Sequence, residues 1–252
     1  MKNIRNDIFK IDSSHFKCAD HFDHIVIDNF LEEEFATRLV DKFPGPTELK
    51  WWSYNNPLEK KLAFNDIKKL NPVFSEFFEE ISSHEFISWL SKFTGIELHA
   101  DPSLNGGGLH LIKSGGKLDV HEDFNIHREM KMLRCVNLII YLNKDWNESW
   151  GGDLELWDKE MTVAFKKIQP IFNRAVLFRT DMNSNHGHPH PLNCPVDRCR
   201  MSLASYFYRK VDDIDSIAYK STYYKKLPGA DDGLEELRER RKLGRINDEV
   251  IG

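Results

Sequence analysis

The sequence predicts a mainly β protein of the α+β class, in which N-terminal helices support an antiparallel sandwich or barrel. Two observations predict this. Aromatic and aliphatic residues recur at helical spacing in three segments before residue 95. From residue 109 onward, short β-rich runs alternate with turn residues. Regular short strands of this kind are typical of antiparallel all-β architectures rather than of βαβ units.

The N-terminal part is predicted to contain one strand and three helices. A strand over residues 24–28 leads into a helix over residues 31–43, with Asn29 and Glu32 spaced as in a capping box and Pro44 as the stop signal. Two more helices are indicated by apolar stripes, made by Phe74, Phe77, Phe78 and Ile81 and by Phe86, Leu90 and Phe93 before Gly95. We assign these stripes to packing against the sheet rather than to a ligand pocket.

The remaining strands and the domain limits follow from the turn residues. Strands are predicted over residues 109–113, 118–123, 134–142, 154–157, 162–165, 175–180 and 201–208. We therefore expect an extension (1–20), one domain (21–212) with helical support (21–107) and a β core (108–212), and a charged tail (213–252). The tail is expected to be a peripheral helix or loose segment without catalytic content. Loops 51–62, 124–132 and 143–150 are expected around the pocket mouth.

Composition excludes several classes of function. The formal net charge of -5 arises from 35 basic and 40 acidic residues mixed along the chain, so no basic stripe predicts a nucleic-acid partner. No apolar run is long enough to span a bilayer. Residues 1–14 contain scattered charges without an apolar core, which favours a cytoplasmic location. The four cysteines, Cys18, Cys135, Cys194 and Cys199, are too dispersed for a disulfide framework and are expected to be thiols.

A candidate metal site begins at His121 and Asp123, near the end of a predicted strand. Residues two apart in a strand point to the same side, so this imidazole and carboxylate can face one ion. A further imidazole is available at His186. Two histidines and one carboxylate form the facial triad of non-haem Fe(II) oxygenases, which leaves positions free for substrate and dioxygen.

The His-rich segment around His186 leaves alternatives open. His186 is preferred as a ligand over His188 because Gly187 would let the backbone approach the metal closely. His188 and His190, which alternate with prolines, are expected to be exposed or to support the site from outside. A structural zinc site made from this cluster with Cys194 and Cys199 is the rival interpretation, although the cysteine spacing fits it poorly.

Arg200 is the candidate anion-binding residue. It stands at the start of the last predicted strand, from which a guanidinium can reach inward. A dicarboxylate co-substrate that chelates iron through a 2-oxo acid needs a cation for its far carboxylate, and arginine offers a permanently charged, bidentate fork. Asn137 points from a central predicted strand and is either a further co-substrate contact or a satisfied core amide.

Six ordered blocks together resemble the prolyl 4-hydroxylase-like branch of the 2-oxoglutarate/Fe(II) dioxygenases over about residues 20–210. They are Gly115-Gly116-Lys117-Leu118-x-x-His121-x-Asp123, Arg134-x-x-Asn137-x-x-x-Tyr141-Leu142-Asn143, Trp150-Gly151-Gly152-Asp153-Leu154, Phe172-Asn173-Arg174-Ala175-Val176-Leu177-Phe178, His186-Gly187-His188-Pro189 and Arg200-Met201-Ser202-Leu203-Ala204. Residues 26–31 are similar to the N-terminal strand and helix of that family.

The resemblance implies a double-stranded β-helix (jelly roll), with iron held by His121, Asp123 and His186. It also implies that Arg200, with help from Ser202, binds 2-oxoglutarate. The implied reaction consumes 2-oxoglutarate and O2 and releases succinate and CO2 while a substrate C–H is hydroxylated; ascorbate is a candidate accessory reductant. The chain departs from the family in having Arg200 where many prolyl 4-hydroxylases use lysine, and Ile112 where a tyrosine precedes the Gly-Gly turn.

The substrate implied by this branch is proline or another amino acid unit, free or in a peptide, with a small metabolite left open. Trp150 and Trp157 flank the Gly151-Gly152 turn and are candidates for an aromatic wall, although Trp157 suits a core position better. The alternative function is a non-catalytic, cupin-like metal-binding module with structural zinc. Arg200 distinguishes the two functions, because a structural metal site needs no buried cation there.

Overall fold

The computed structural model describes residues 1–18, 20–180 and 183–243. Its helices are α1 (Glu33–Asp41), α2 (Pro72–Ser82), α3 (His84–Thr94) and α4 (Glu235–Lys242). Its strands are β1 (His24–Ile27), β2 (Trp52–Asn56), β3 (Glu59–Phe64), β4 (His99–Ala100), β5 (Gly108–Lys113), β6 (Lys117–Glu122), β7 (Ile126–His127), β8 (Met132–Tyr141), β9 (Leu154–Trp157), β10 (Ala164–Ile168), β11 (Arg174–Arg179), β12 (His186–His188), β13 (Cys199–Arg209) and β14 (Tyr223–Tyr224). None of the described helices is both long and apolar enough to cross a membrane.

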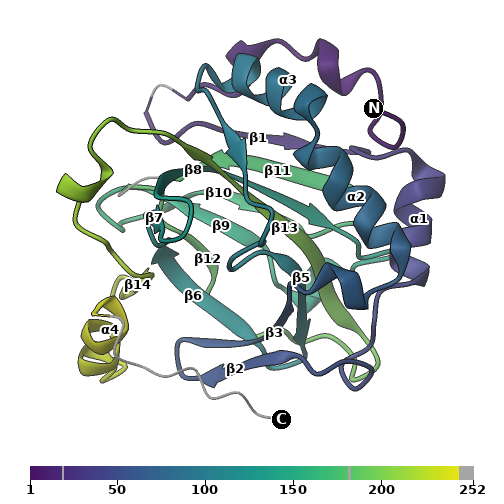
Figure 1. The fold of residues 1–252 in the computed structure, drawn as a ribbon. Coiled ribbons are helices and arrows are strands. Elements are labelled where there is room, and N and C mark those ends of the chain that lie inside the picture. The colour runs from purple at the N-terminus through teal and green to yellow at the C-terminus, as the bar shows by residue number, and fades with distance from the viewer. Residues whose placement is uncertain (19, 181–182, 244–252) are drawn as a thin grey trace.

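The strands pair in antiparallel ladders, in the order β1-β11-β8-β13-β5-β3-β6-β12-β9-β10, with β2, β4, β7 and β14 attached at the sides. This continuous sheet curls on itself, with α1, α2 and α3 together on one side and α4 on another (Figure 1). The fold is the predicted jelly roll: β1, β11, β8, β13 and β5 form one face, and β6, β12, β9 and β10 form the opposing one.

The strict alternation of side chains along β5, β8 and β13 separates the apolar core from the cavity. Leu109, Leu138 and Leu203 point toward the N-terminal helices and are buried in the main hydrophobic cluster. The alternate positions of the same strands face the interior of the jelly roll, because successive side chains leave a strand on opposite sides. One face of this sheet is therefore scaffold and the other is free to carry a site.

The helical stripes have the structural role assigned to them. Phe74, Phe77, Phe86, Leu90 and Phe93 are all buried in the main cluster. In α3, the ring of Phe86 lies 6.1 Å from the ring of Phe207 in β13, which ties this helix directly to the sheet. The helix ends at Gly95, whose φ of 74° is the left-handed C-cap conformation that glycine adopts at low cost.

Two local predictions were wrong. Asn29 does not cap α1: it lies in a turn with φ of 53°, and the N-cap is Glu32, whose side chain makes no capping hydrogen bond. Residues 51–62, predicted as a loop, instead form most of the β2–β3 hairpin, and β3 bridges β5 and β6. The hairpin was missed because Glu59, Lys60 and Lys61 break the apolar alternation, although Glu59 is buried.

Candidate active site

The three predicted metal ligands meet at one point inside the jelly roll. His121 lies in β6, Asp123 directly follows that strand, and His186 opens β12 opposite His121 in the ladder. One potential ligand atom of each lies within 4.8 Å of the others. Asp123 Oδ1 is 3.6 Å from His121 Nε2, and Asp123 Oδ2 is 3.5 Å from His186 Nε2. In the described part of the chain, this is the one group of three such side chains that converges.

Backbone carbonyls orient both imidazoles for metal binding. Nδ1 of His121 lies 2.9 Å from the Asp119 carbonyl, and Nδ1 of His186 lies 2.8 Å from the Ser184 carbonyl. A carbonyl only accepts, so each Nδ1 carries the hydrogen and each Nε2 presents a lone pair toward Asp123. Burial lowers the pKa of His186 to about 4, although Asp123 opposes this shift. The geometry fits a divalent ion bound by neutral imidazoles.

Asp123 is held in its ionised form by Arg134 and Asn137. Arg134 Nη2 lies 2.8 Å from Asp123 Oδ2, and Asn137 donates to the same oxygen at 2.9 Å. Burial alone would raise the pKa of Asp123, but Arg134 and the two histidines hold it well below its usual range. Asn137 also accepts from Arg134 at 3.0 Å, so its amide positions the metal-facing carboxylate. Asn137 still lines the cavity, and its predicted contact with the co-substrate stays a prediction.

Gly187 is required by strand packing rather than by a direct approach to the metal. A Cβ at this position would lie 2.8 Å from the carbonyl oxygens of both Leu118 and Asp119 in β6. The Asp119 carbonyl is the group that orients His121. The missing side chain therefore lets β12 lie against β6 closely enough to bring His186 to His121.

A cavity of about 370 Å³ extends from this cluster to Arg200. Arg200 is 5 % exposed, donates from Nε to the Gly152 carbonyl at 2.8 Å, and lies 3.1 Å from the Tyr141 hydroxyl. It makes no ion pair with any residue that the structure describes. Burying an unpaired charge is costly, so the site is suited to an anion that enters the cavity. Gly152 makes room for the guanidinium, because a Cβ there would lie 3.1 Å from Arg200 Cδ.

The inward positions of three strands form the walls around Arg200. Ser202 follows Arg200 on the same side of β13 and pairs in register with Tyr141 and His110. Its buried side chain lines the cavity. This position agrees with the prediction that Ser202 helps Arg200 to bind 2-oxoglutarate. Ile112, which replaces the expected tyrosine, also lines the wall. A tyrosine nevertheless reaches the guanidinium from another strand, because Tyr141 of β8 points to the same place.

Of the two alternatives expected for His188, the structure contradicts the exposed one. It is 3 % exposed, lines the cavity with Arg200, and neither ring nitrogen has a hydrogen-bond partner in the structure. Burial, and then the Arg200 guanidinium, lower its pKa well below the ordinary value, so the ring is neutral. His190, in contrast, is exposed as predicted. The strand period explains the difference: His188 is two residues from His186 in β12 and faces the same side.

The C-terminal segment lines the cavity, and the expectation of a peripheral helix or loose segment is therefore wrong. β14 pairs with β6, with Tyr224 opposite His121 and their rings 5.4 Å apart. In α4, Arg241 forms an ion pair with the buried carboxylate of Glu59, and both line the cavity beside Tyr224. Because β3 pairs only with Lys117 and Leu118 at the start of β6, β14 can pair with the end of that strand, and residues near the C-terminal end close one wall.

The zinc alternative and the tryptophan wall find no support. Cys194 and Cys199 are free thiols, and neither joins a ligand cluster among the described residues. Trp150 packs edge-on against Trp146, and the indole N–H of Trp157 donates to Glu155 at 2.9 Å. Neither Trp150 nor Trp157 lines the cavity. The aromatic residues that do line it are Tyr54, Phe124, Tyr141, Tyr206 and Tyr224.

The segment that carries these site residues is similar to known protein families. Residues 107–208 match the model of the 2OG-Fe(II) oxygenase superfamily, and this range contains His121, Asp123, His186 and Arg200. This match supports a 2-oxoglutarate/Fe(II) oxygenase-like domain in this part of the chain. Two relatives that align with about three quarters of the chain are prolyl 3-hydroxylases. The prolyl 3-hydroxylase OGFOD1 of Mus musculus is 26 % identical over 194 residues, which cover 75 % of this chain and 33 % of that protein. Its Xenopus laevis counterpart is 23 % identical over 192 residues (74 % and 35 %).

The chain spans about a third of the length of these two curated relatives. Solved structures of prolyl hydroxylases share its fold. A Pseudomonas putida prolyl-4-hydroxylase superposes with a TM-score of 0.55, with 15 % identity over 79 % of this chain and 99 % of that one. A Trichoplax adhaerens prolyl hydroxylase in complex with a hypoxia inducible factor peptide superposes with 0.54, with 19 % identity over 80 % and 89 %.

Proposed function

We propose that this protein is a 2-oxoglutarate- and Fe(II)-dependent hydroxylase that acts on an unactivated C–H bond of a prolyl or other amino acid unit. The observation that carries the proposal is the buried, unpaired Arg200 in the same cavity as the His121, Asp123 and His186 cluster. A structural metal site would have no use for that cation. A 2-oxo dicarboxylate, in contrast, needs both a metal and a distant cation.

The metal and the far carboxylate of the co-substrate would be bound at two different ends of one cavity. His121, Asp123 and His186 would hold Fe(II), and Arg200 with Ser202 would bind the far carboxylate of 2-oxoglutarate. When bound, iron supplies the redox chemistry by which 2-oxoglutarate and O2 give succinate and CO2 while one oxygen atom enters a substrate C–H bond. Arg134 and Asn137 keep Asp123 ionised and aimed at the metal, and the buried walls exclude water.

The prolyl substrate is the finer part of the proposal. It is supported by the names of the relatives, which are prolyl hydroxylases, and by aromatic residues such as Phe124 and Tyr206 beside the cluster. Pyrrolidine rings pack well on aromatic faces in other proline-binding grooves.

The experiment combines two readouts on purified protein supplied with Fe(II) and 2-oxoglutarate. Succinate release measures turnover, and mass spectrometry detects a gain of about 16 Da, one oxygen atom, on free proline and on proline-containing peptides. Coupled succinate release and oxygen incorporation are expected with a proline-containing substrate. Stimulation by a non-amino-acid metabolite alone would refute the prolyl assignment, and absence of succinate in protein that retains only zinc would favour the metal-binding module.

His188 is expected to be a further contact for the co-substrate. Its two unpartnered ring nitrogens lie in the cavity that holds Arg200, and a neutral ring can donate one N–H to a carboxylate. A hydrogen bond to a charged group contributes about 1.5–3 kcal/mol, so His188→Leu should raise the KM for 2-oxoglutarate about tenfold or more. The exposed His190→Leu is the matched control. An unchanged KM in His188→Leu would remove this residue from the binding site.

A further inference from the structure

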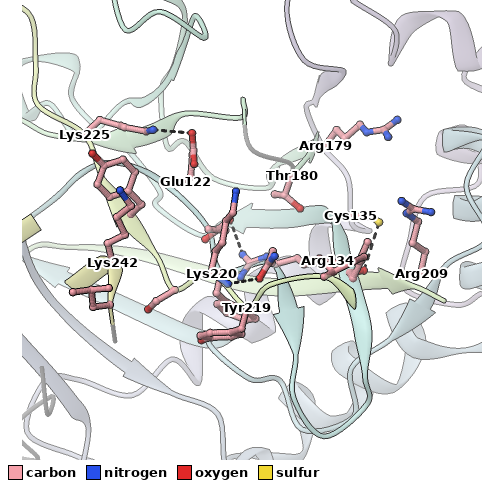
Figure 2. Close-up of a pocket in the computed structure, with 18 residues that line it drawn as sticks. Glu122, Arg134, Cys135, Arg179, Thr180, Arg209, Tyr219, Lys220, Lys225 and Lys242 are labelled. Atoms are coloured by element: carbon pink, nitrogen blue, oxygen red, sulfur yellow. Dashed lines mark hydrogen bonds and ion pairs between the residues drawn. The ribbon is translucent and has the colours of Figure 1, made fainter. Parts of the chain in front are cut away.

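A second cavity, of about 580 Å³, opens beside the metal cluster (Figure 2). It shares Asp123, Phe124, Arg134 and Ser221 with the inner cavity, so the two meet at the carboxylate of the triad. Arg200 lines only the inner cavity. The co-substrate end and this outer groove therefore lie on different sides of the metal cluster.

The outer groove is strongly basic. Its described lining contains two carboxylates, Glu122 and Asp123, and six cations: Arg134, Arg179, Arg209, Lys220, Lys225 and Lys242. Both carboxylates are paired with cations of the same groove, Asp123 with Arg134 at 2.8 Å and Glu122 with Lys225 at 2.7 Å. The whole chain has the opposite sign, with a net charge of -5. Positive charge is thus concentrated at this entrance.

The cations surround the groove rather than forming a single cluster. Figure 2 shows Lys225 and Lys242 at one end, Arg179 and Arg209 at the other, and Arg134 between them. Three of the six cations are exposed: Arg209 at the end of β13, Lys220, and Lys242 at the end of α4. An extended anionic segment lying across the groove would meet positive charge at both ends of it.

Apolar and aromatic side chains share the lining of the groove with these cations. They are Phe124, Leu133, Tyr219 and Tyr223. Lys225 and Lys242 lie 4.4 and 4.6 Å from the centre of the Tyr223 ring. This combination suits a polypeptide with one apolar residue between acidic ones. It suits a nucleic acid less well, because the net charge of the chain, -5, would repel a long phosphate backbone.

We propose that this groove binds an acidic polypeptide segment and that its charges select the substrate. The proposal rests on the hydroxylase function, since it names the substrate class of the same site. The cations at the two ends would attract the acidic residues that flank the modified one and would fix its position along the groove. Electrostatic complementarity of this kind raises association rates and excludes partners of the wrong charge.

The test measures peptide binding apart from turnover. Fluorescent peptides with one central proline would carry Asp and Glu flanks, the matching Asn and Gln flanks, or Lys flanks. Binding to the protein loaded with Fe(II) and 2-oxoglutarate without O2 would be followed by fluorescence anisotropy at low and high salt. The double variant Arg209→Glu/Lys242→Glu would be compared with Lys42→Glu/Lys92→Glu, two exposed lysines of the helical side that give the same change in net charge.

The acidic peptide is expected to bind most tightly, with an affinity that falls as salt rises. The groove variant should bind it roughly tenfold more weakly, since each reversed contact changes from attraction to repulsion, whereas the control variant should bind as the wild type does. Equal binding of acidic and neutral peptides, equal losses in both variants, or tighter binding of an oligonucleotide than of the acidic peptide would overturn the proposal.

Succinate release distinguishes this failure from failure of the hydroxylase function. Charge-selective binding without succinate from any peptide would leave the groove proposal standing and refute the hydroxylase. Succinate release that is equally efficient with neutral and acidic peptides would refute the groove proposal and leave the hydroxylase standing.

Discussion

Replacing His121, Asp123 or His186 with alanine is expected to abolish succinate release. Each change removes one of the three atoms that converge on the metal position. Even the outer hydrogen-bond partners of metal ligands cost about 10–100-fold in metal affinity or activity when mutated, so loss of a ligand should exceed that range. Iron content after gel filtration and succinate release would be measured together. Alanine at the exposed His190 is the matched control and should leave both unchanged.

Asp123 needs an additional control because its removal leaves the buried Arg134 without a carboxylate partner. Breaking a buried ion pair by removing one partner typically costs about 3–5 kcal/mol, so Asp123→Ala is expected to lower the melting temperature as well. Asp123→Asn keeps the size of the side chain and is the second variant. An active, iron-replete His186→Ala enzyme, together with loss of iron in His188→Ala, would show that the ligand had been assigned to the wrong histidine.

Arg200→Ala is expected to raise the 2-oxoglutarate requirement by well over tenfold while iron binding persists. Removing one partner of a buried, hydrogen-bonded charge pair costs about 2–5 kcal/mol. The Gly152 carbonyl and the Tyr141 hydroxyl would then lose their guanidinium partner. The KM for 2-oxoglutarate, iron content and melting temperature would be compared in the same preparations, so that a folding defect is separated from a binding defect.

Two variants sharpen the Arg200 experiment. Arg200→Lys retains the charge without the bidentate fork and should fall between the wild type and alanine. Arg198→Ala alters the neighbouring arginine, which bonds the Lys144 carbonyl and lies 5.2 Å from the Trp150 ring, outside the cavity. It should behave as wild type. An unchanged 2-oxoglutarate requirement in Arg200→Ala would mean that the far carboxylate is bound elsewhere.

The elements best predicted from the sequence are those whose pattern repeats several times within one segment. The sequence located α2, α3 and the strand at residues 154–157 closely. Where one face of a helix or strand is buried, its apolar residues recur with a regular period that can be recognised in the sequence. Elements of two or three residues are too short to show such a period. β12 has three residues and β14 has two, and both pair with β6 only because the rest of the fold brings them to its edge.

The metal cluster was accessible from the sequence for a related reason. His121 and Asp123 are two residues apart at the end of one strand, so strand geometry alone places them together. His186 is distant in sequence, and its orientation toward Asp123 depends on Gly187 and on the carbonyl of Ser184. The type of the third ligand was predictable, whereas the contacts that position it were not.

The sequence by itself determined the class of fold and placed His121 and Asp123 together, and it offered His186, ahead of His188, and Arg200 as candidates for the rest of the site. Only the tertiary structure decided that His188 is buried beside Arg200, that Asn137 bonds Asp123, and that the C-terminal segment closes the site next to a basic groove. The physical reason is the distance in sequence over which each property is decided. Periodicity and short spacing report which side of a strand or helix a residue occupies, whereas burial, charge pairing and cavity walls depend on segments that meet only after the sheet has curled.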